Sequence, residues 1–330
     1  MAKPRIDLGT ARPLLDIASY ARCGPGERLH LSQEEIQVLS RTVRRTPEVM
    51  VKVLTKGGQD LKAVGQHLAY LSREGDVEIE TDDGRRLSGE GTERELLEDW
   101  DLDLEEVRRT RELRSRPGLA RPKLVHKVVL SMPAGTPADG LLRAARAFAR
   151  EIFGAQHRYA MVLHTDEPHP HVHMVVKAVS EQGLRLNIRK GTLREWRREF
   201  ARHLRAQSIS ANATDRAVRG NLRPKLSDGM YRALQRDASC RIPTHQGTTG
   251  IERTSSAEAS GRESLLRTRA EVERGWRAAA DILERQGQQD MAWYVKRFTD
   301  ALPPVRTDRE LLRRAPGSQE LRPLQRELTR

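Results

Sequence analysis

The spacing of apolar residues in the central part of the chain switches between the period of a β-strand and that of an α-helix. Short apolar or alternating runs ended by glycine, proline or polar residues predict strands over 49–54, 77–80, 123–131, 158–164 and 171–179. Apolar residues three or four positions apart predict helices over 32–44, 60–73, 92–111, 141–152 and 192–207. The last two strands are joined by too few residues for a parallel crossover, so we expect them to pair antiparallel. This order of elements predicts one sheet packed by helices, in an α+β or α/β fold.

The composition on either side of this central part predicts further regions. The N-terminal arm has one helix, which begins with a Ser-Gln-Glu-Glu capping box at Ser32. The central domain ends in a basic helical extension over 185–240, and a Gly-, Thr- and Ser-rich linker follows it. The C-terminal region is charged, with helices expected over 262–285 and 290–301. The four regions are 1–45, 46–240, 241–261 and 262–330.

Composition and charge narrow the class of protein. In 330 residues there is no apolar run of about 18, the length of a membrane span, so membrane insertion is not expected. The first residues lack the apolar stretch of a secretory signal, and Cys23 and Cys240 are too far apart for a disulfide framework or a metal knuckle, so we expect a cytoplasmic protein with reduced thiols. The net charge of +13 favours a polyanionic partner. Acidic residues dominate 74–106, whereas lysine and arginine dominate 185–236.

Candidate chemistry is concentrated between the last two predicted strands, where four of the ten histidines fall within ten residues. His171 and His173 are two apart on a strand and therefore point to one face. His164 ends the preceding strand and would lie beside them in an antiparallel pair. Three imidazoles with open coordination positions suit a divalent metal and phosphate oxygens. Asp166 could orient a histidine or accept a proton, while His169 lies in the loop, and a role for it is as plausible as simple exposure to solvent.

The pattern His-x-Asp-x-x-His-Pro-His-x-His, followed by Met-Val-Val, resembles the three-histidine motif of conjugative relaxases of the P-type mobilization class, in the HUH endonuclease superfamily. Upstream, Tyr70 in Tyr-Leu-Ser-Arg is similar to the tyrosine motif of these enzymes, and it lies off the apolar stripe of its helix. Between the two, the strand that ends at Ser131 before Met-Pro-Ala-Gly resembles their second motif. The likeness covers about 49–179.

The resemblance implies a palm with a central, mainly antiparallel sheet packed by helices. It implies an enzyme that nicks one DNA strand at a transfer origin, keeps the 5′ end as a phosphotyrosine and later rejoins it. Tyr70 would be the nucleophile, Asp166 would assist with its proton, and Ser131 would contact the active site or DNA. Mg²⁺ or Mn²⁺ would be held by His164, His171 and His173. Basic residues expected to bind DNA are Arg73, Arg189, Lys190, Arg194, Arg197 and Arg198.

The resemblance also implies partners: single-stranded or supercoiled DNA, relaxosome accessory proteins and a type IV secretion coupling protein. It allows for carriage of the protein with the DNA into a recipient cell. Contacts with protein partners are expected in the charged C-terminal region. Trp196 and Phe200 stand four apart on the basic helix and are expected in its core rather than stacked on bases.

Two alternatives remain. Residues 169–175 also match, loosely, the His-φ-His-φ-His-φ-φ pattern of histidine-triad nucleotide hydrolases, although Pro170 occupies the first apolar place. That alternative leaves the tyrosine motif and the basic block unexplained. The other alternative is a DNA-binding relaxosome accessory protein with a catalytically inactive nuclease fold, which the charge and the low aromatic content of 4% also fit.

Overall fold

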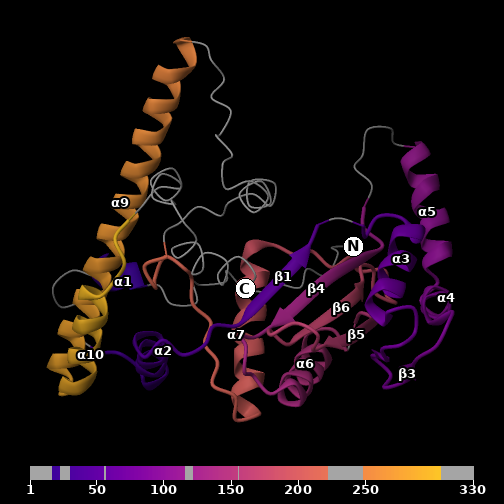
Figure 1. Cartoon of the computed structure of the whole chain (residues 1–330), viewed down its shortest axis with the longest axis horizontal. Coiled ribbons are helices and arrows are strands. Elements are labelled where there is room, and N and C mark those ends of the chain that lie inside the picture. Colours follow the sequence, from indigo (N-terminus) through magenta and orange to yellow (C-terminus); the bar gives the residue numbers. More distant parts are fainter. Residues whose placement is uncertain are drawn as a thin grey trace. The chain divides into compact units, whose positions relative to one another are not determined.

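The computed structural model describes the placement of residues 17–22, 30–55, 57–115, 122–154, 156–221 and 248–305 (Figure 1). These residues form two compact units. The sheet unit comprises residues 46–213, and the helical unit comprises residues 17–45 together with 214–305. The expectations for 1–16, for 222–247 and for the tail 306–330 lie outside the described residues. Among the helices that the structure describes, none combines the length and apolar character that crossing a bilayer needs.

In the described part of the chain, the sheet unit is built on a six-stranded, entirely antiparallel sheet with the strand order β1-β4-β6-β5-β2-β3. The strands are β1 (Met50–Leu54), β2 (Ile79–Thr81), β3 (Arg86–Leu87), β4 (Val125–Ser131), β5 (Tyr159–His164) and β6 (His171–Lys177). The expected antiparallel hairpin is therefore β5–β6. The fold is α+β, as predicted.

Helices cover both faces of this sheet (Figure 1). Side chains of β4, β5 and β6 alternate between the two faces, so each strand serves two cores. On one face, Val128, Met161 and Met174 pack with α6 (Ala138–Ile152) and α7 (Lys190–Ala206). On the other, Val162 and Val175 pack with α3 (Leu61–Ser72), α4 (Thr92–Asp99) and α5 (Leu102–Ser115). The result is three layers, helix–sheet–helix.

A cluster of aromatic rings joins α6 and α7. Phe148 is fully buried and makes edge-to-face contacts with Phe153, Trp196 and Phe200, with ring centroids 5.8–6.4 Å apart. Aromatic pairs in this geometry contribute about 0.5–1.5 kcal/mol each beyond the area they bury. The expectation that Trp196 and Phe200 lie in the core is confirmed.

Part of the acidic block over 74–106 is neutralised by arginines within the sheet unit. Arg158 pairs with Asp82 at 2.8 Å and with Asp99 at 2.7 Å, and Arg146 pairs with Glu80 at 2.6 Å. Because β2 and β5 are neighbours, these pairs tie the acidic segment to the sheet.

The elements differ from expectation at two places in this block. The helix expected over 92–111 is two helices, α4 and α5, because Asp101 adopts a left-handed conformation with φ 50° that interrupts the helix. The two-residue strand β3, which pairs with β2, was not predicted, since so short a run carries no detectable alternation.

The helical unit combines the two ends of the described chain. It contains α1 (Ile17–Arg22), α2 (Gln33–Val43), α9 (Thr248–Arg285) and α10 (Gln289–Asp300). The backbone of Leu31 exchanges two hydrogen bonds with the side chain of Gln286, and Trp276 is buried and donates to the carbonyl of Val218 at 2.9 Å. The capping box of Ser32 and Glu35 is present. The expected arm is thus packed with the C-terminal helices.

Residues 248–261, assigned to the linker from their composition, instead form the first turns of α9. Extending an existing helix costs little, because each added residue gains a backbone hydrogen bond without a new nucleation step.

Candidate active site

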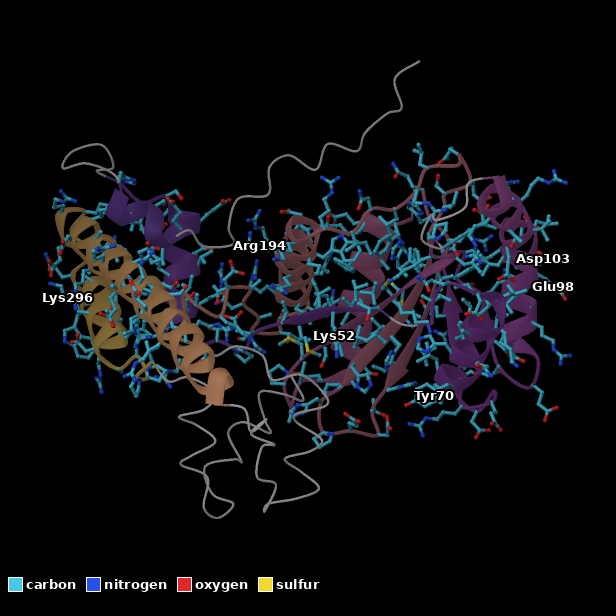
Figure 2. All side chains as sticks on the ribbon, turned by 90° about the horizontal axis from the view of Figure 1, so that it is seen from above. Lys52, Tyr70, Glu98, Asp103, Arg194 and Lys296 are labelled. Carbon is cyan, nitrogen blue, oxygen red and sulfur yellow. The ribbon has the colours of Figure 1, made fainter. Side chains whose placement is uncertain are left out.

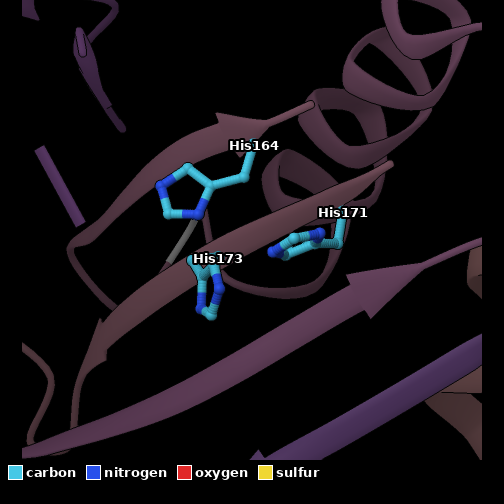
Figure 3. A group of neighbouring side chains, drawn as sticks. All are labelled: His164, His171 and His173. Carbon is cyan, nitrogen blue, oxygen red and sulfur yellow. The ribbon is translucent and has the colours of Figure 1, made fainter. Parts of the chain in front are cut away.

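Three histidines meet where β5 ends and β6 begins (Figure 3). In the antiparallel register His164 is directly opposite His171, so both side chains lie on the same face of the sheet. His173 is two residues along β6 and shares that face. Val172 and Met174 point to the opposite face, into the core with α6 and α7. The alternation of β6 therefore separates the histidines from the apolar core beneath them.

The three imidazoles are close enough to share one ion. Their ring centroids are 4.9–5.4 Å apart, and one nitrogen from each ring lies within 4.8 Å of the other two. Figure 3 shows the rings converging from the two strands.

Backbone carbonyls set the orientation of two rings. The Nε2 atom of His164 lies 2.9 Å from the carbonyl oxygen of Leu71, and the Nδ1 atom of His171 lies 3.0 Å from that of His169. A carbonyl oxygen can only accept, so each of these nitrogens carries the proton and donates. Metal-binding histidines commonly donate from one ring nitrogen in this way and bind the ion through the other.

The charge state of the third ring also suits a cation. Burial, and then the proximity of His171 and His164, lowers the pKa of His173 to about 3, which keeps its imidazole neutral near pH 7. A neutral imidazole nitrogen is a ligand for a divalent metal. The donor set of the three histidines therefore fits a divalent cation with coordination positions left for other ligands.

An open cavity of about 780 Å³ is lined by the three histidines and by one face of α3. That face presents Tyr70, whose side chain is 71% exposed, at the surface of the sheet unit (Figure 2). The opposite face of α3 packs on the sheet through the buried residues Val64, Leu68 and Leu71. As expected, Tyr70 lies off this buried stripe. The structure thus brings Tyr70 and the three histidines to the same cavity.

Arg73 and Asp166 also line this cavity and are paired with each other at 2.6 Å. Arg73 ends α3 in a left-handed conformation with φ 51°, and Asp166 lies in the loop between β5 and β6. The hydrogen bond from Arg73 lowers the pKa of Asp166. Asp166 is therefore ionised near neutral pH, and the pair links the end of α3 to the histidine loop.

Ser131 and His169 both lie next to His171, but only Ser131 has its side chain in the same row as the cluster. Ser131 is buried at the end of β4 and is directly opposite His171 in the register, so it lies in the same row of side chains. His169 contributes its backbone carbonyl to His171, whereas its own ring is not part of the cluster. The third histidine of the cluster is His164, from the neighbouring strand.

The basic residues of α7 are not brought to this cavity. Helix α7 packs through Trp196 and Phe200 on the face of the sheet that the histidines do not occupy. In Figure 2, Arg194 and Tyr70 project from different sides of the sheet unit. Of the α7 residues expected to bind DNA, Arg198 is paired with Glu195 at 3.1 Å.

One residue near the site was missed from the sequence. The ring of His67 lies edge-on to His173, with centroids 6.4 Å apart. Burial, and then the charge of Lys127, lowers the pKa of His67 to about 4, so the ring is neutral. Its position one helical turn before Tyr70 was the available signal.

An antiparallel sheet with three histidines on adjacent strands, beside an exposed tyrosine on a covering helix, is the arrangement that the resemblance to HUH nucleases implies. Comparison with protein families agrees with this assignment: residues 70–208 match the model described as relaxase, MobA/VirD2-like, nuclease domain. Over this part of the chain the match bears out the resemblance to relaxases found in the motifs.

Curated relatives are similar over a wider region. The T-DNA border endonuclease VirD2 of Rhizobium radiobacter is 28% identical over 225 residues, which is 64% of this chain and 51% of that protein. The VirD2 proteins of Agrobacterium fabrum and Rhizobium rhizogenes are each 28% identical, over 59% and 58% of this chain and 46% of their own length. The chain therefore spans about half the length of the curated relatives it matches.

Proposed function

We propose that this protein nicks one strand of DNA at a transfer origin and later rejoins it, through a covalent 5′-phosphotyrosyl intermediate that initiates conjugative transfer. One observation carries the proposal: an exposed tyrosine and three histidines, whose nitrogens lie within 4.8 Å of one another, line the same cavity. The match of residues 70–208 to relaxase nuclease domains supports it.

Tyr70 is the proposed nucleophile. Its phenolic oxygen forms a bond to phosphorus, and the bond from phosphorus to the 3′ oxygen breaks, which leaves a free 3′ hydroxyl and the 5′ end on the protein. The energy of the phosphodiester is kept in the phosphotyrosine, so a 3′ hydroxyl can reverse the step without ATP. The exposure of Tyr70 supports this role, because a bulky DNA strand must reach its hydroxyl.

His164, His171 and His173 would hold Mg²⁺ or Mn²⁺. When bound there, such an ion supplies a Lewis acid for a phosphoryl oxygen and stabilises negative charge on the phosphate. The histidines themselves orient the site: the carbonyls of Leu71 and His169 fix two rings, so little reorganisation is needed when substrate binds.

Asp166, or a histidine near it, is proposed to take the phenolic proton. The pairing with Arg73 keeps Asp166 ionised and able to accept. The same pairing makes it a weak base, which favours a role in holding Arg73 at the cavity until a phosphate binds. Ser131 is proposed to contact the active site through its place beside His171.

The basic residues of α7, among them Arg189, Lys190, Arg194 and Arg197, are proposed to contact DNA away from the nick, because their helix lies on the other face of the sheet. Accessory proteins of a relaxosome and a type IV secretion coupling protein are the proposed protein partners, with the charged C-terminal region, 262–330, as the region that they contact.

The direct test is a nicking assay on supercoiled plasmid that carries the DNA flanking the gene, with Mg²⁺ or Mn²⁺. We expect an open circle with protein attached to its 5′ end, which is absent with Tyr70→Phe and in EDTA. A nick that persists in Tyr70→Phe would contradict the assignment of the nucleophile.

The same assay separates the two alternatives. A histidine-triad hydrolase would release product from a mononucleotide substrate without metal and without a DNA adduct. The cluster does not favour this alternative, since its third ring comes from His164 rather than His169. Salt-sensitive DNA binding with no nick would indicate an inactive accessory protein.

A further inference from the structure

The histidine face of the sheet continues beyond the histidines toward β1. Cross-strand register arranges its side chains in rows. One row runs from His173 across Val129 to Lys52 on β1. In the next row Lys127 of β4 lies between Leu54 and Val175. With strands about 4.8 Å apart, Lys52 is roughly 10 Å from His173 across two strand spacings. Two lysines therefore lie on the same face as the metal-binding candidates, on the side away from β5.

Lys127 is in an unusual state for a lysine. It is 94% buried, with a relative exposure of 6%, and it forms no hydrogen bond or ion pair with the residues that the structure describes. Its ammonium group lies against Gly57, where a Cβ atom would come within 2.8 Å of Nζ. Gly57 has φ +73°, a conformation that favours glycine. The loop after β1 thus leaves space for this ammonium.

The charged groups near Lys127 do not include a free carboxylate to pair with it among the described residues. Burial lowers its pKa, while the carboxylate of Asp60 raises it and the charge of Lys123 lowers it. Asp60 is already engaged in accepting from the backbone amide of Ala63 at 2.7 Å, as the cap of α3. A lysine side chain this buried loses much of its hydration, and an anion that pairs with the ammonium group offsets that cost.

Resting on the proposed function, we infer that Lys127 and Lys52 form a phosphate-binding subsite on β4 and β1. This subsite would hold the backbone of the single DNA strand on the β1 side of the scissile phosphate. The ligand chemistry is a phosphodiester. Lys52 is exposed on β1 and available to a second phosphate of the same strand (Figure 2). The bound strand therefore crosses the histidine face of the sheet, and α7 on the opposite face takes no part in holding it at the nick.

The salt dependence of DNA binding tests this subsite without requiring cleavage. Fluorescence anisotropy would follow the binding of a labelled oligothymidylate of about 20 nucleotides in EDTA, over a series of NaCl concentrations. Each phosphate contact contributes about −0.7 to the slope of log K against log salt for a single strand. We expect Lys127→Met to bind about tenfold more weakly, with a slope shallower by about 0.7. Lys127→Arg should keep the wild-type slope.

Lys177 provides a matched control. It is a buried lysine on the same face of the sheet, with a relative exposure of 8%, but it is paired with Glu181 at 3.0 Å. Lys177→Met should leave the affinity and the slope unchanged. If Lys127→Met does not fold, Lys52→Ala replaces it as the test, because Lys52 is exposed and its truncation is tolerated.

The outcomes separate this inference from the proposed function. Wild-type slope and affinity in Lys127→Met, or equal losses in Lys127→Met and Lys177→Met, would overturn the subsite while leaving the nicking proposal intact. Failure of the wild-type protein to bind the oligonucleotide at any salt concentration would overturn both. Nicking that persists in Tyr70→Phe would overturn the proposed nucleophile, while weaker binding and a shallower slope in Lys127→Met would leave the subsite standing.

Discussion

Replacing His173 with glutamine in the presence of Mn²⁺ perturbs the three-histidine cluster at the ring that burial and its neighbours keep neutral. A ligand that binds only the folded state stabilises it by RT ln(1 + [L]/Kd), about 2.7 kcal/mol at a concentration of 100 Kd. The sheet unit spans residues 46–213. For a unit of that size each kcal/mol corresponds to about 2–4 °C, so saturating Mn²⁺ should raise its Tm by about 5–10 °C.

The three ligand nitrogens all come from β5 and β6 in the middle of the sheet, so the ion can bind only when these strands are paired. Loss of one of three ligands should weaken binding by about 100-fold or more, which reduces the shift in Tm at the same Mn²⁺ concentration to about 1 °C. The assay is thermal unfolding followed by circular dichroism with Mn²⁺ and with EDTA, after calorimetry has given the wild-type Kd.

A second cluster provides the matched control. Glu151, Glu199 and His203 also place ligand atoms within 4.8 Å of one another. Arg202, however, binds both carboxylates, at 2.6 and 2.7 Å, which leaves no need for a cation. His203→Gln should therefore keep the full Mn²⁺ shift. A shift that survives His173→Gln, or one that is lost in His203→Gln, would refute the assignment of the metal to the histidines of β5 and β6.

Three further predictions concern the framework of the site. Phe148→Ala should lower the free energy of unfolding by about 3–5 kcal/mol in urea titrations, because the ring is fully buried among other aromatic rings. Arg73→Ala should raise the pKa of Asp166 toward its ordinary value, as measured by carboxyl carbon NMR, because the hydrogen bond from Arg73 is what lowers it. A carboxyl group whose pKa is lower in the folded than in the unfolded state stabilises the fold, fully so above its unfolded pKa. The wild type should therefore be more stable than Arg73→Ala at neutral pH. The difference should disappear as the pH falls below the folded pKa of Asp166. Gly75→Ala should be destabilising by at least about 1 kcal/mol more than Gly84→Ala, since both have positive φ but only at Gly75 would the Cβ clash with backbone, that of Gly89.

Several features of this structure could be predicted from local sequence patterns, because they depend on interactions between residues that are close in sequence. Alternation along β6 placed His171 and His173 on one face, and the short connection placed His164 beside them. The capping box at Ser32 was readable because its hydrogen bonds join residues three apart. The period of the apolar residues in α3 left Tyr70 off the buried stripe.

Contacts between distant segments were not readable in the same way. The proton of His164 is directed by the carbonyl of Leu71, a backbone atom that has no sequence signature. Nothing in the pattern of α7 indicates which face of the sheet it covers, so its arginines were expected to bind DNA with no indication of where they lie relative to the histidines. The packing of Leu31 against Gln286 joins residues 255 apart in sequence, and composition alone suggested a separate arm.

The pairing of Arg73 with Asp166 shows a further limit of sequence reasoning. Each residue was assigned its own role from its type and its place near a motif. The structure places them 2.6 Å apart, so the electrostatics of one depend on the other. Such coupling follows from the left-handed end of α3 and the course of the β5–β6 loop, both of which are tertiary features.

The proposed covalent intermediate between Tyr70 and DNA can be identified by mass spectrometry of the trapped adduct. The protein would be incubated with Mn²⁺ and a single-stranded oligonucleotide that spans the mapped nick, then digested with nuclease and protease. We expect the peptide containing Tyr70 to carry the mass of a 5′-linked nucleotide. A nucleotide on another of the five tyrosines, or on a histidine, would contradict it.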